Sequence, residues 1–347
     1  EALEVSAHNQ VRQQGGADGV GSMEAWNVFG WVAPEVATGS VANALRGDFG
    51  QPHASDAGAE VLWQGGTLEA EGALSVLAEG LSTYAATVDA LPITSFATDE
   101  AEAQHASLAI ANSSVSARHR VSLGRSGEAP GTTDSLSQAT ISSGVDVHIS
   151  AKDRTVADAL VAFSSLGQVN RVDSAIAQTW VDGHTEIALF EAALNSAGAV
   201  KIAGEAIRAQ SSELQGATQL METKRPLRDA PAGARAVNVA AGDVYVDVDS
   251  SPVTAVGDVD ITALATNQAA AHHDLAIRVN SSEFPIDEND PADWSLAANV
   301  VGLLAVDPTS METLLNTDLD AANAAEVAVY LSDSDVVAGG GISVAAG

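Results

Sequence analysis

Few side chains in this sequence are spaced for catalysis. Nucleophilic hydrolysis needs a serine beside a base, commonly displayed on a Gly-x-Ser-x-Gly turn. The nearest match is Ser126 in the run Gly-Arg-Ser-Gly, which lacks this spacing and follows no clear hydrophobic strand. We therefore interpret Ser126 as a loop serine, and we expect no catalytic residue and no enzymatic activity.

Metal chemistry would need histidines and carboxylates that converge on one ion. The two densest groups are residues 272–274 (His-His-Asp) and residues 182–186 (Asp-Gly-His-Thr-Glu). Adjacent residues of a helix point about 100° apart, so His272 and His273 do not share a zinc ion without help. Solvent-exposed histidines are the better interpretation of both groups.

Clusters of carboxylates suit calcium better than zinc, because calcium prefers oxygen ligands. The candidates lie on or beside two predicted strands and in one acidic loop: Asp247, Asp249, Asp258, Asp260, Asp287 and Asp290. The usual calcium-loop spacing Asp-x-Asp-x-Asp-Gly is absent, and an acidic surface produces such clusters by itself. We expect no cofactor, with structural cations at these aspartates as an open alternative.

The composition excludes several classes of protein. The 347 residues include 46 Asp and Glu but only 15 Lys and Arg, which gives a net charge of −31, and there is no Cys. Without Cys there is no disulfide framework, thiolate zinc site or catalytic thiol. The negative charge argues against a nucleic-acid partner, because phosphate contacts need a basic surface. No uncharged stretch, including the apolar residues 294–306, reaches the roughly 18 residues that a transmembrane helix needs.

The charge balance is typical of proteins that work in brine. Only three of the basic residues are Lys, and the charges repel one another strongly at ordinary ionic strength. In molar salt the Debye length falls to about 3 Å, which removes most of this repulsion. We therefore expect a protein from a salt-loving organism or its virus. An ordinary acidic secreted protein remains the alternative.

Patterning along the chain predicts an α+β protein with mixed and antiparallel sheets, and the alternative is a mainly-β virion or surface protein. Four regions are expected: an extended N-terminal arm (1–55), a β-rich region (56–150), a helical region (151–218) and a mixed α/β sheet region (219–347). Alternating apolar and acidic residues at 244–249 predict a half-solvated strand. No internal repeat is evident. Two sequons, at Asn112 and Asn280, would accept glycans if the chain were exposed outside a cell.

The helical prediction comes from spacing. Residues 155–158 (Thr-Val-Ala-Asp) are similar to a capping box, and Val156, Leu160, Val161 and Phe163 follow at helical intervals. Glycines interrupt the pattern, so we expect two to four helices.

Two groups of residues are predicted to make contacts between copies. Trp26, Phe29 and Trp31 form an aromatic cluster in the arm, and each such ring buries about 150–250 Å² when it packs. Lys224, Arg225 and Arg228 form the one basic cluster, in a proline-containing segment. The alternatives are a short core helix for the first group and a solvated loop for the second.

The order arm, β-rich extension, helical middle and closing mixed sheet resembles HK97-fold major capsid proteins of tailed viruses. The resemblance covers most of the chain, is architectural only, and implies a spine helix within 153–197. It implies a self-assembling virion protein whose partners are copies of itself and other virion proteins. The alternative is a secreted or surface spike, adhesin or surface-layer protein of a halophile, and a halophilic enzyme is the third hypothesis.

Overall fold

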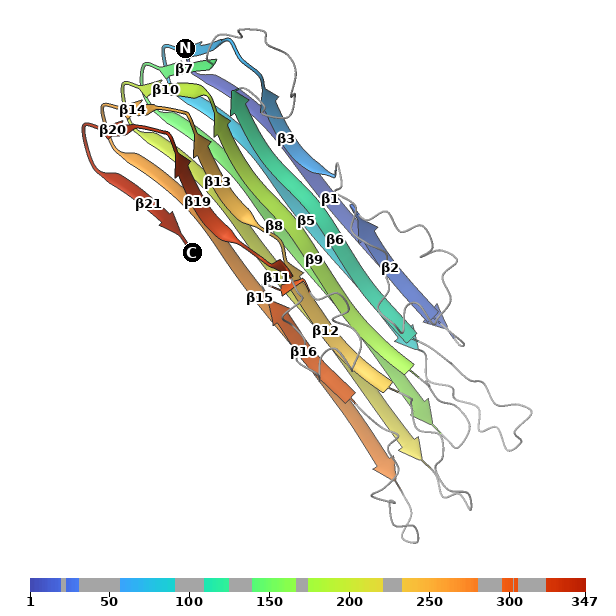
Figure 1. Cartoon of the computed structure of the whole chain (residues 1–347). Coiled ribbons are helices and arrows are strands. Elements are labelled where there is room, and N and C mark those ends of the chain that lie inside the picture. Colours follow the sequence, from blue (N-terminus) through green and yellow to red (C-terminus); the bar gives the residue numbers. More distant parts are fainter. Residues whose placement is uncertain are drawn as a thin grey trace, which may run out of the picture.

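The computed structural model describes residues 1–19, 23–30, 57–90, 109–124, 139–166, 174–220, 233–279, 295–301, 303–304 and 323–347. Every regular element in these ranges is a β-strand (Figure 1). The expected α+β fold with a helical middle is therefore wrong, and so is the HK97-like architecture built on it. The described residues include no helix that is long and apolar enough to cross a membrane.

Sheet A, an all-parallel sheet of six strands, contains the longest strands. Its order is β1 (Leu3–Gly19), β5 (Leu74–Ala90), β8 (Val147–Leu166), β11 (Val200–Leu220), β15 (Val259–Val279) and β21 (Ile342–Ala346). The strands stack in direct register, with Leu3 beside Leu74 and Leu74 beside Val147. The strands β11 and β15 have 21 residues each, which is about 70 Å at 3.3 Å per residue.

Sheet B faces sheet A and is also parallel. Its members are β2 (Met23–Phe29), β3 (Gly58–Trp63), β6 (Ala109–Gly124), β9 (Ser174–Phe190), β12 (Gly233–Ala241), β13 (Val244–Asp249), β16 (Ser295–Val301) and β19 (Val327–Ser332). A separate antiparallel pair consists of β17 (Leu303–Leu304) and β18 (Asn323–Ala324).

Sheet C closes one end of the two long sheets with short strands: β4 (Thr67–Ala70), β7 (Ala139–Ser143), β10 (Ala192–Ser196), β14 (Val253–Ala255) and β20 (Val336–Ala338). The chain passes from sheet A to sheet B, then to sheet C, and returns to sheet A one strand further along. Figure 1 shows the long strands side by side with the sheet C strands gathered at one end. The fold is a flat parallel β-solenoid.

A nine-residue motif marks each turn from sheet C into sheet A, so the expectation of no internal repeat is wrong. Its pattern is apolar–x–Ala/Ser–x–Gly–x–apolar–x–apolar, at 68–76, 141–149, 194–202, 253–261 and 336–344, with the glycine one place earlier in the second copy. A Cβ on Gly198 would lie 2.2 Å from Asp146 Oδ1 and 2.6 Å from the Val145 carbonyl oxygen. The glycine is needed because successive corners stack closely.

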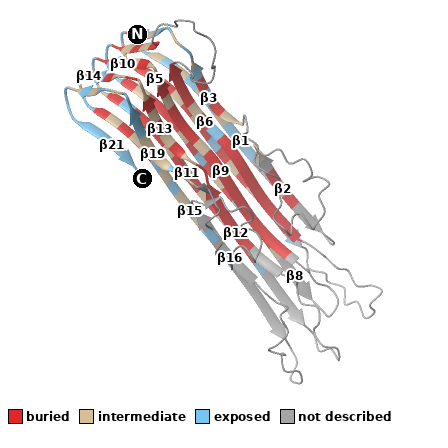
Figure 2. Ribbon diagram, in the orientation of Figure 1, coloured by how far each residue is buried: buried red, intermediate tan, exposed pale blue. Residues whose placement is uncertain are grey.

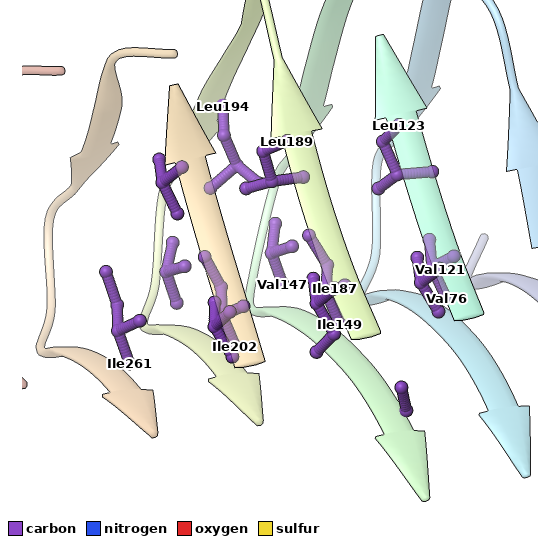
Figure 3. Close-up of a cluster of buried hydrophobic side chains, with 14 of the residues drawn as sticks. Val76, Val121, Leu123, Val147, Ile149, Ile187, Leu189, Leu194, Ile202 and Ile261 are labelled. Atoms are coloured by element: carbon purple, nitrogen blue, oxygen red, sulfur yellow. The ribbon is translucent and has the colours of Figure 1, made fainter. Parts of the chain in front are cut away.

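The apolar core lies between the long sheets beside sheet C. Alternate residues of each strand point inward, so Val147 and Ile149 on β8 meet Ile187 and Leu189 on β9 in one buried cluster. Figure 3 shows these side chains converging from both sheets, and Figure 2 shows the buried positions continuing along the strands. Burying these rows is the main driving force for stacking the coils.

The helical prediction for 151–218 failed because the interior is small and polar there. On β8 the buried positions are Asp153, Thr155, Ala157, Ala159 and Val161, which show little hydrophobic alternation. The larger Val156 and Leu160 point outward, and their spacing imitates one face of a helix.

Sheet B is interrupted at one level of the stack. The strand β2 ends opposite Val115 and β3 begins opposite Arg118, while β12 ends opposite Asp182 and β13 begins opposite Thr185. No extra residue is inserted on the β12–β13 side, so the interruption is a gap in the hydrogen-bond ladder and not a bulge.

Candidate functional site

A buried polar layer divides the interior of the solenoid at the level of this interruption. Apolar clusters lie on either side of it along the strands. Its fully or almost fully buried members are Ser82, Tyr84, His119, Asp153, Thr155, Thr179, Thr185, Arg208, Gln210, Ser212 and Asn238. Since buried polar groups are costly unless they are paired, this layer is the part of the core with the most specific requirements.

Arg208 on β11 lies at the centre of the layer with only 1% of its surface exposed. Its Nε lies 3.4 Å from Asp153 Oδ2. Its Nη2 donates to the carbonyl oxygen of Gly183 at 2.6 Å, and its Nη1 donates to that of Gly242 at 3.2 Å. The guanidinium therefore joins two strands of sheet A to β9 and to the connection between β12 and β13 in sheet B.

Glycine is required at this gap both on β9 and in the connection between β12 and β13. A Cβ on Gly183 would lie 2.7 Å from Asp153 Oδ2, and a Cβ on Gly242 would lie 1.9 Å from the Gly183 carbonyl oxygen. Gly242 also has a φ of 105°, in the left-handed range that side chains disfavour. The backbone can turn its carbonyls toward Arg208 only because neither residue has a side chain.

His119 on β6 completes the centre of the layer. It is fully buried, and neither ring nitrogen has a hydrogen-bond partner. Its Nδ1 lies 3.9 Å from Asp153 Oδ1, which is too long for a hydrogen bond. Burial lowers the pKa of His119, and the nearby Arg208 lowers it further, although Asp153 raises it. The ring lies against Gly80, where a Cβ would lie 1.7 Å from its Nε2.

The outer side of the gap carries an accessible ionisable group. His184 lies between two carboxylates, with Nδ1 3.4 Å from Asp243 Oδ2 and Nε2 3.6 Å from Asp182 Oδ1. The hydrogen bond to Asp243 raises the pKa of His184 and lowers that of Asp243, while burial raises the pKa of Asp182. Only the backbone at Gly183 separates the buried guanidinium of Arg208 from the outer imidazole of His184.

A ladder of hydroxyl and amide side chains extends the layer along sheet B. Thr179 Oγ1 and Ser212 Oγ each donate to Asn238 Oδ1 at 2.6 Å, and Asn238 Nδ2 donates to Asn299 Oδ1 at 2.8 Å. These bonds connect β9, β11, β12 and β16. They position the strands relative to one another and expose no reactive group to solvent.

A second ion-pair group lies on the outward face of sheet B. Arg118 Nη2 donates to Glu186 Oε2 at 2.6 Å, and Arg120 Nε lies 3.3 Å from Glu186 Oε1. Glu186 is almost fully buried beneath the two arginines. The carboxylate of Glu186 on β9 therefore pairs with two arginines of β6, which stabilises the pairing of these strands.

The predicted cation candidates do not converge where they are described. Asp247 and Asp249 lie on the outward face of β13 in sheet B, whereas Asp258 precedes β15 and Asp260 lies on it in sheet A. Asp258 Oδ1 instead accepts the Gly341 amide at 2.7 Å. Asp287 and Asp290 lie outside the described residues. Within the described ranges, no three His, Asp or Glu residues are arranged to hold a metal ion.

The predicted contact residues can be followed only in part. Trp26 is half-buried on β2 and packs against Ile110 and Ile176, and Phe29 packs against the Tyr84 ring with centroids 6.0 Å apart. Both aromatics therefore make contacts within the chain. Trp31, Lys224, Arg225 and Arg228 lie outside the described residues.

Sequence reasoning missed the central group of Arg208, Asp153 and His119. In the sequence, each of these residues is a single polar or charged residue at a position that faces the interior of a strand. Such a position can be recognised only once the strand and its register are known. Comparisons with protein families, curated proteins and solved structures found no match.

Proposed function

We propose that this chain is a structural module of a secreted or cell-surface protein of a halophile, in which the solenoid supports broad faces exposed to brine. The observation that carries the proposal is the direct-register stacking of coils, with Val147 beside Val200 and Val200 beside Val259. A stack of this kind builds an extended scaffold from a short motif. Each further coil lengthens the scaffold through the same contacts with its neighbour.

The distribution of charge supports the same function. Among the described residues most acidic side chains lie at outward positions, while the interior holds apolar rows and a polar layer in which Asp153 pairs with Arg208. The electrostatic repulsion between carboxylates is therefore largest at the surface of the solenoid. High salt screens this repulsion. The two features together suit a scaffold that works in a salt-rich exterior.

The virion hypothesis has lost its architectural support, because the helices that gave the resemblance are strands. It remains an untested prediction, as does the absence of enzymatic activity. Asn112, one of the two sequons, is fully buried on β6, so the folded chain has no accessible glycan acceptor there. Asn280 lies outside the described residues.

Localisation tests the proposal. Antibodies raised against the purified chain should label intact cells of the source organism kept in molar salt, and brief protease treatment of those cells should remove the signal. A soluble cytoplasmic protein serves as the control for cell integrity. Labelling that appears only after lysis contradicts the proposal, and recovery of the chain in purified virus particles would favour the virion hypothesis.

A further inference from the structure

We propose that the outer side of the gap in sheet B is a pH-sensitive contact, in which protonated His184 holds the Asp243 carboxylate that anchors the start of β19. Loss of this proton loosens β19 from the neighbouring strands. The device acts within the fold, and it goes beyond the scaffold function proposed above.

Four ionisable residues form one row across sheet B at the gap. Arg118 on β6 is the register partner of His184 on β9. Asp243 and Glu326 continue the row, because each directly precedes a strand, β13 or β19, and β13 pairs with both β9 and β19 from the next residue onward. With His184 protonated, the row therefore consists of two cations followed by two anions.

The Asp243 carboxylate joins β9 to the start of β19. Its Oδ2 lies 3.4 Å from Nδ1 of His184, and its Oδ1 accepts the backbone amide of Glu326 at 2.8 Å. The Glu326 carbonyl oxygen accepts the Val244 amide at 2.8 Å, and the Glu326 carboxylate accepts the Tyr330 hydroxyl. One carboxylate thus fixes the position at which β19 begins.

A neutral imidazole cannot serve both carboxylates that flank it. The second ring nitrogen of His184, Nε2, lies 3.6 Å from Oδ1 of Asp182, a residue that is only 3% exposed. An imidazolium carries an N–H on each nitrogen, whereas the neutral ring carries only one. Loss of the proton therefore leaves Asp182 and Asp243 with a single donor and no positive charge between them.

Two arginines lie close to His184 but are engaged elsewhere. Arg118 donates from Nη2 to Glu186 Oε2 at 2.6 Å. Arg208 lies on the interior side of the sheet, where its Nη2 donates to the Gly183 carbonyl oxygen at 2.6 Å. Neither guanidinium lies between the two carboxylates that flank the imidazole.

The surrounding charges favour the protonated ring in the folded chain. The contact with Asp243 raises the pKa of His184 most, and burial opposes it. Asp182 adds to the rise, while Arg208 lowers the pKa from the interior side. The net shift is upward, so the folded chain keeps the proton to a higher pH than the unfolded chain does. The contact is therefore closed at low pH and opens as the pH rises through the folded pKa.

The gap in sheet B allows this contact to open locally. The hydrogen-bond ladder between β9 and its neighbours is interrupted between Asp182 and Thr185. On the interior side, Arg208 donates to the carbonyl oxygens of both Gly183 and Gly242 at the same level. We therefore expect the outer contact to loosen while the interior one keeps the strands together.

Hydrogen exchange at the Glu326 amide tests this device. Exchange of the folded chain in molar KCl is followed by NMR from pH 6 to pH 9, and each rate is divided by the intrinsic rate at that pH. Protection of the Glu326 amide should fall severalfold as the pH rises. This fall should exceed that of the core amide of Val147, which bonds the Ala199 carbonyl oxygen and reports on the whole fold.

Three variants separate the parts of the contact. His184→Gln should give low protection of the Glu326 amide across the whole pH range. Asp243→Asn keeps an oxygen that can accept this amide but removes the charge, so the pH dependence should disappear and His184 should titrate at a lower pH than in the parent. His272→Gln changes an exposed histidine of β15 and should behave as the parent does.

Three results would overturn the proposal. If His184 titrates while protection of the Glu326 amide stays constant, the ring does not hold β19. If protection falls equally at Glu326 and Val147, the pH acts on the whole fold. If His184→Gln keeps the parent's circular dichroism and its pH dependence, another group is responsible. Should His184→Gln fail to fold, the parent and Asp243→Asn decide between these outcomes.

Discussion

Arg208 on β11 donates a hydrogen bond to the carbonyl oxygen of Gly183 on β9 at 2.6 Å, so one side chain crosses the interior from sheet A to sheet B. The same guanidinium faces Asp153, and both side chains are 1% exposed. This contact ties the ion pair in the core to the gap in the sheet B ladder. It makes the polar layer the most sensitive part of the fold.

The first prediction concerns this ion pair. Arg208→Met should destabilise the folded chain by about 3–5 kcal/mol, because it leaves Asp153 buried without a counter-charge. The double variant Arg208→Met/Asp153→Leu should lose less than the sum of the two single variants. Urea denaturation in molar KCl measures these free energies of unfolding, and additive losses would show that the two charges do not interact.

The second prediction concerns the glycine beneath His119. Gly80→Ala should cost about 1–3 kcal/mol, because the new methyl group overlaps the buried imidazole. The matched control is Gly204→Ala on β11, where the nearest atom would be 3.4 Å away, and it should be neutral or slightly stabilising. If Gly80→Ala remains equally costly when His119 is already Ala, the overlap is not the cause.

The third prediction is a pH dependence. Burial lowers the pKa of His119 in the folded chain, so below the usual pKa near 6.5 the unfolded chain binds a proton that the folded chain does not. The free energy of unfolding should therefore fall as the pH drops from 7.5 to 5, and His119→Gln should reduce this fall. Denaturation at several pH values gives the comparison, and parallel curves for the two proteins would contradict it.

His184 should behave in the opposite sense. Its pKa is raised, chiefly by the hydrogen bond to Asp243, so its contribution is fully present below its unfolded pKa and is lost as the pH rises through the folded one. His184→Gln should accordingly cost more stability at pH 6 than at pH 9. The same denaturation series measures this difference, and a cost that is independent of pH would exclude a protonated His184.

The fourth prediction follows from the charge of −31. Removing KCl should unfold the chain, because the acidic surface then repels itself over a longer distance. Asp247→Asn/Asp249→Asn should fold at a lower KCl concentration than the parent, as followed by circular dichroism. The neutral surface change Thr254→Ala is the control. A chain that is equally folded without salt would show that brine is not needed for folding.

Strands could be predicted from the sequence where their inward residues are large and apolar, and they were missed where these residues are small or polar. The strand at β13 was predicted because Val244, Val246 and Val248 alternate with polar residues. Most of β8, together with β9 and β11, was predicted to be helical because small or polar residues such as Ala157, Thr179 and Gln210 fill many of the inward positions and hide the period of two. The polar layer could not be predicted, because the register that brings Asp153, Arg208 and His119 together is a property of the stacked coils.

The repeat was visible in principle but difficult to detect. Only a few apolar positions and one glycine recur, the glycine shifts to Gly144 in the second copy, and the copies are separated by irregular intervals. Alignment on the turn into sheet A, with Leu74, Val147 and Val200 superposed, would have indicated a solenoid.

The central claim, a direct-register parallel stack, is tested most directly by electron–electron distances between spin labels at Glu4 and Asp260. These outward positions share one row of sheet A, four strand spacings apart, or about 19 Å between backbones. Because the chain has no Cys, single pairs can be introduced without background. A narrow distribution near this distance is the predicted result, and a broad distribution or one centred beyond about 35 Å would contradict the solenoid.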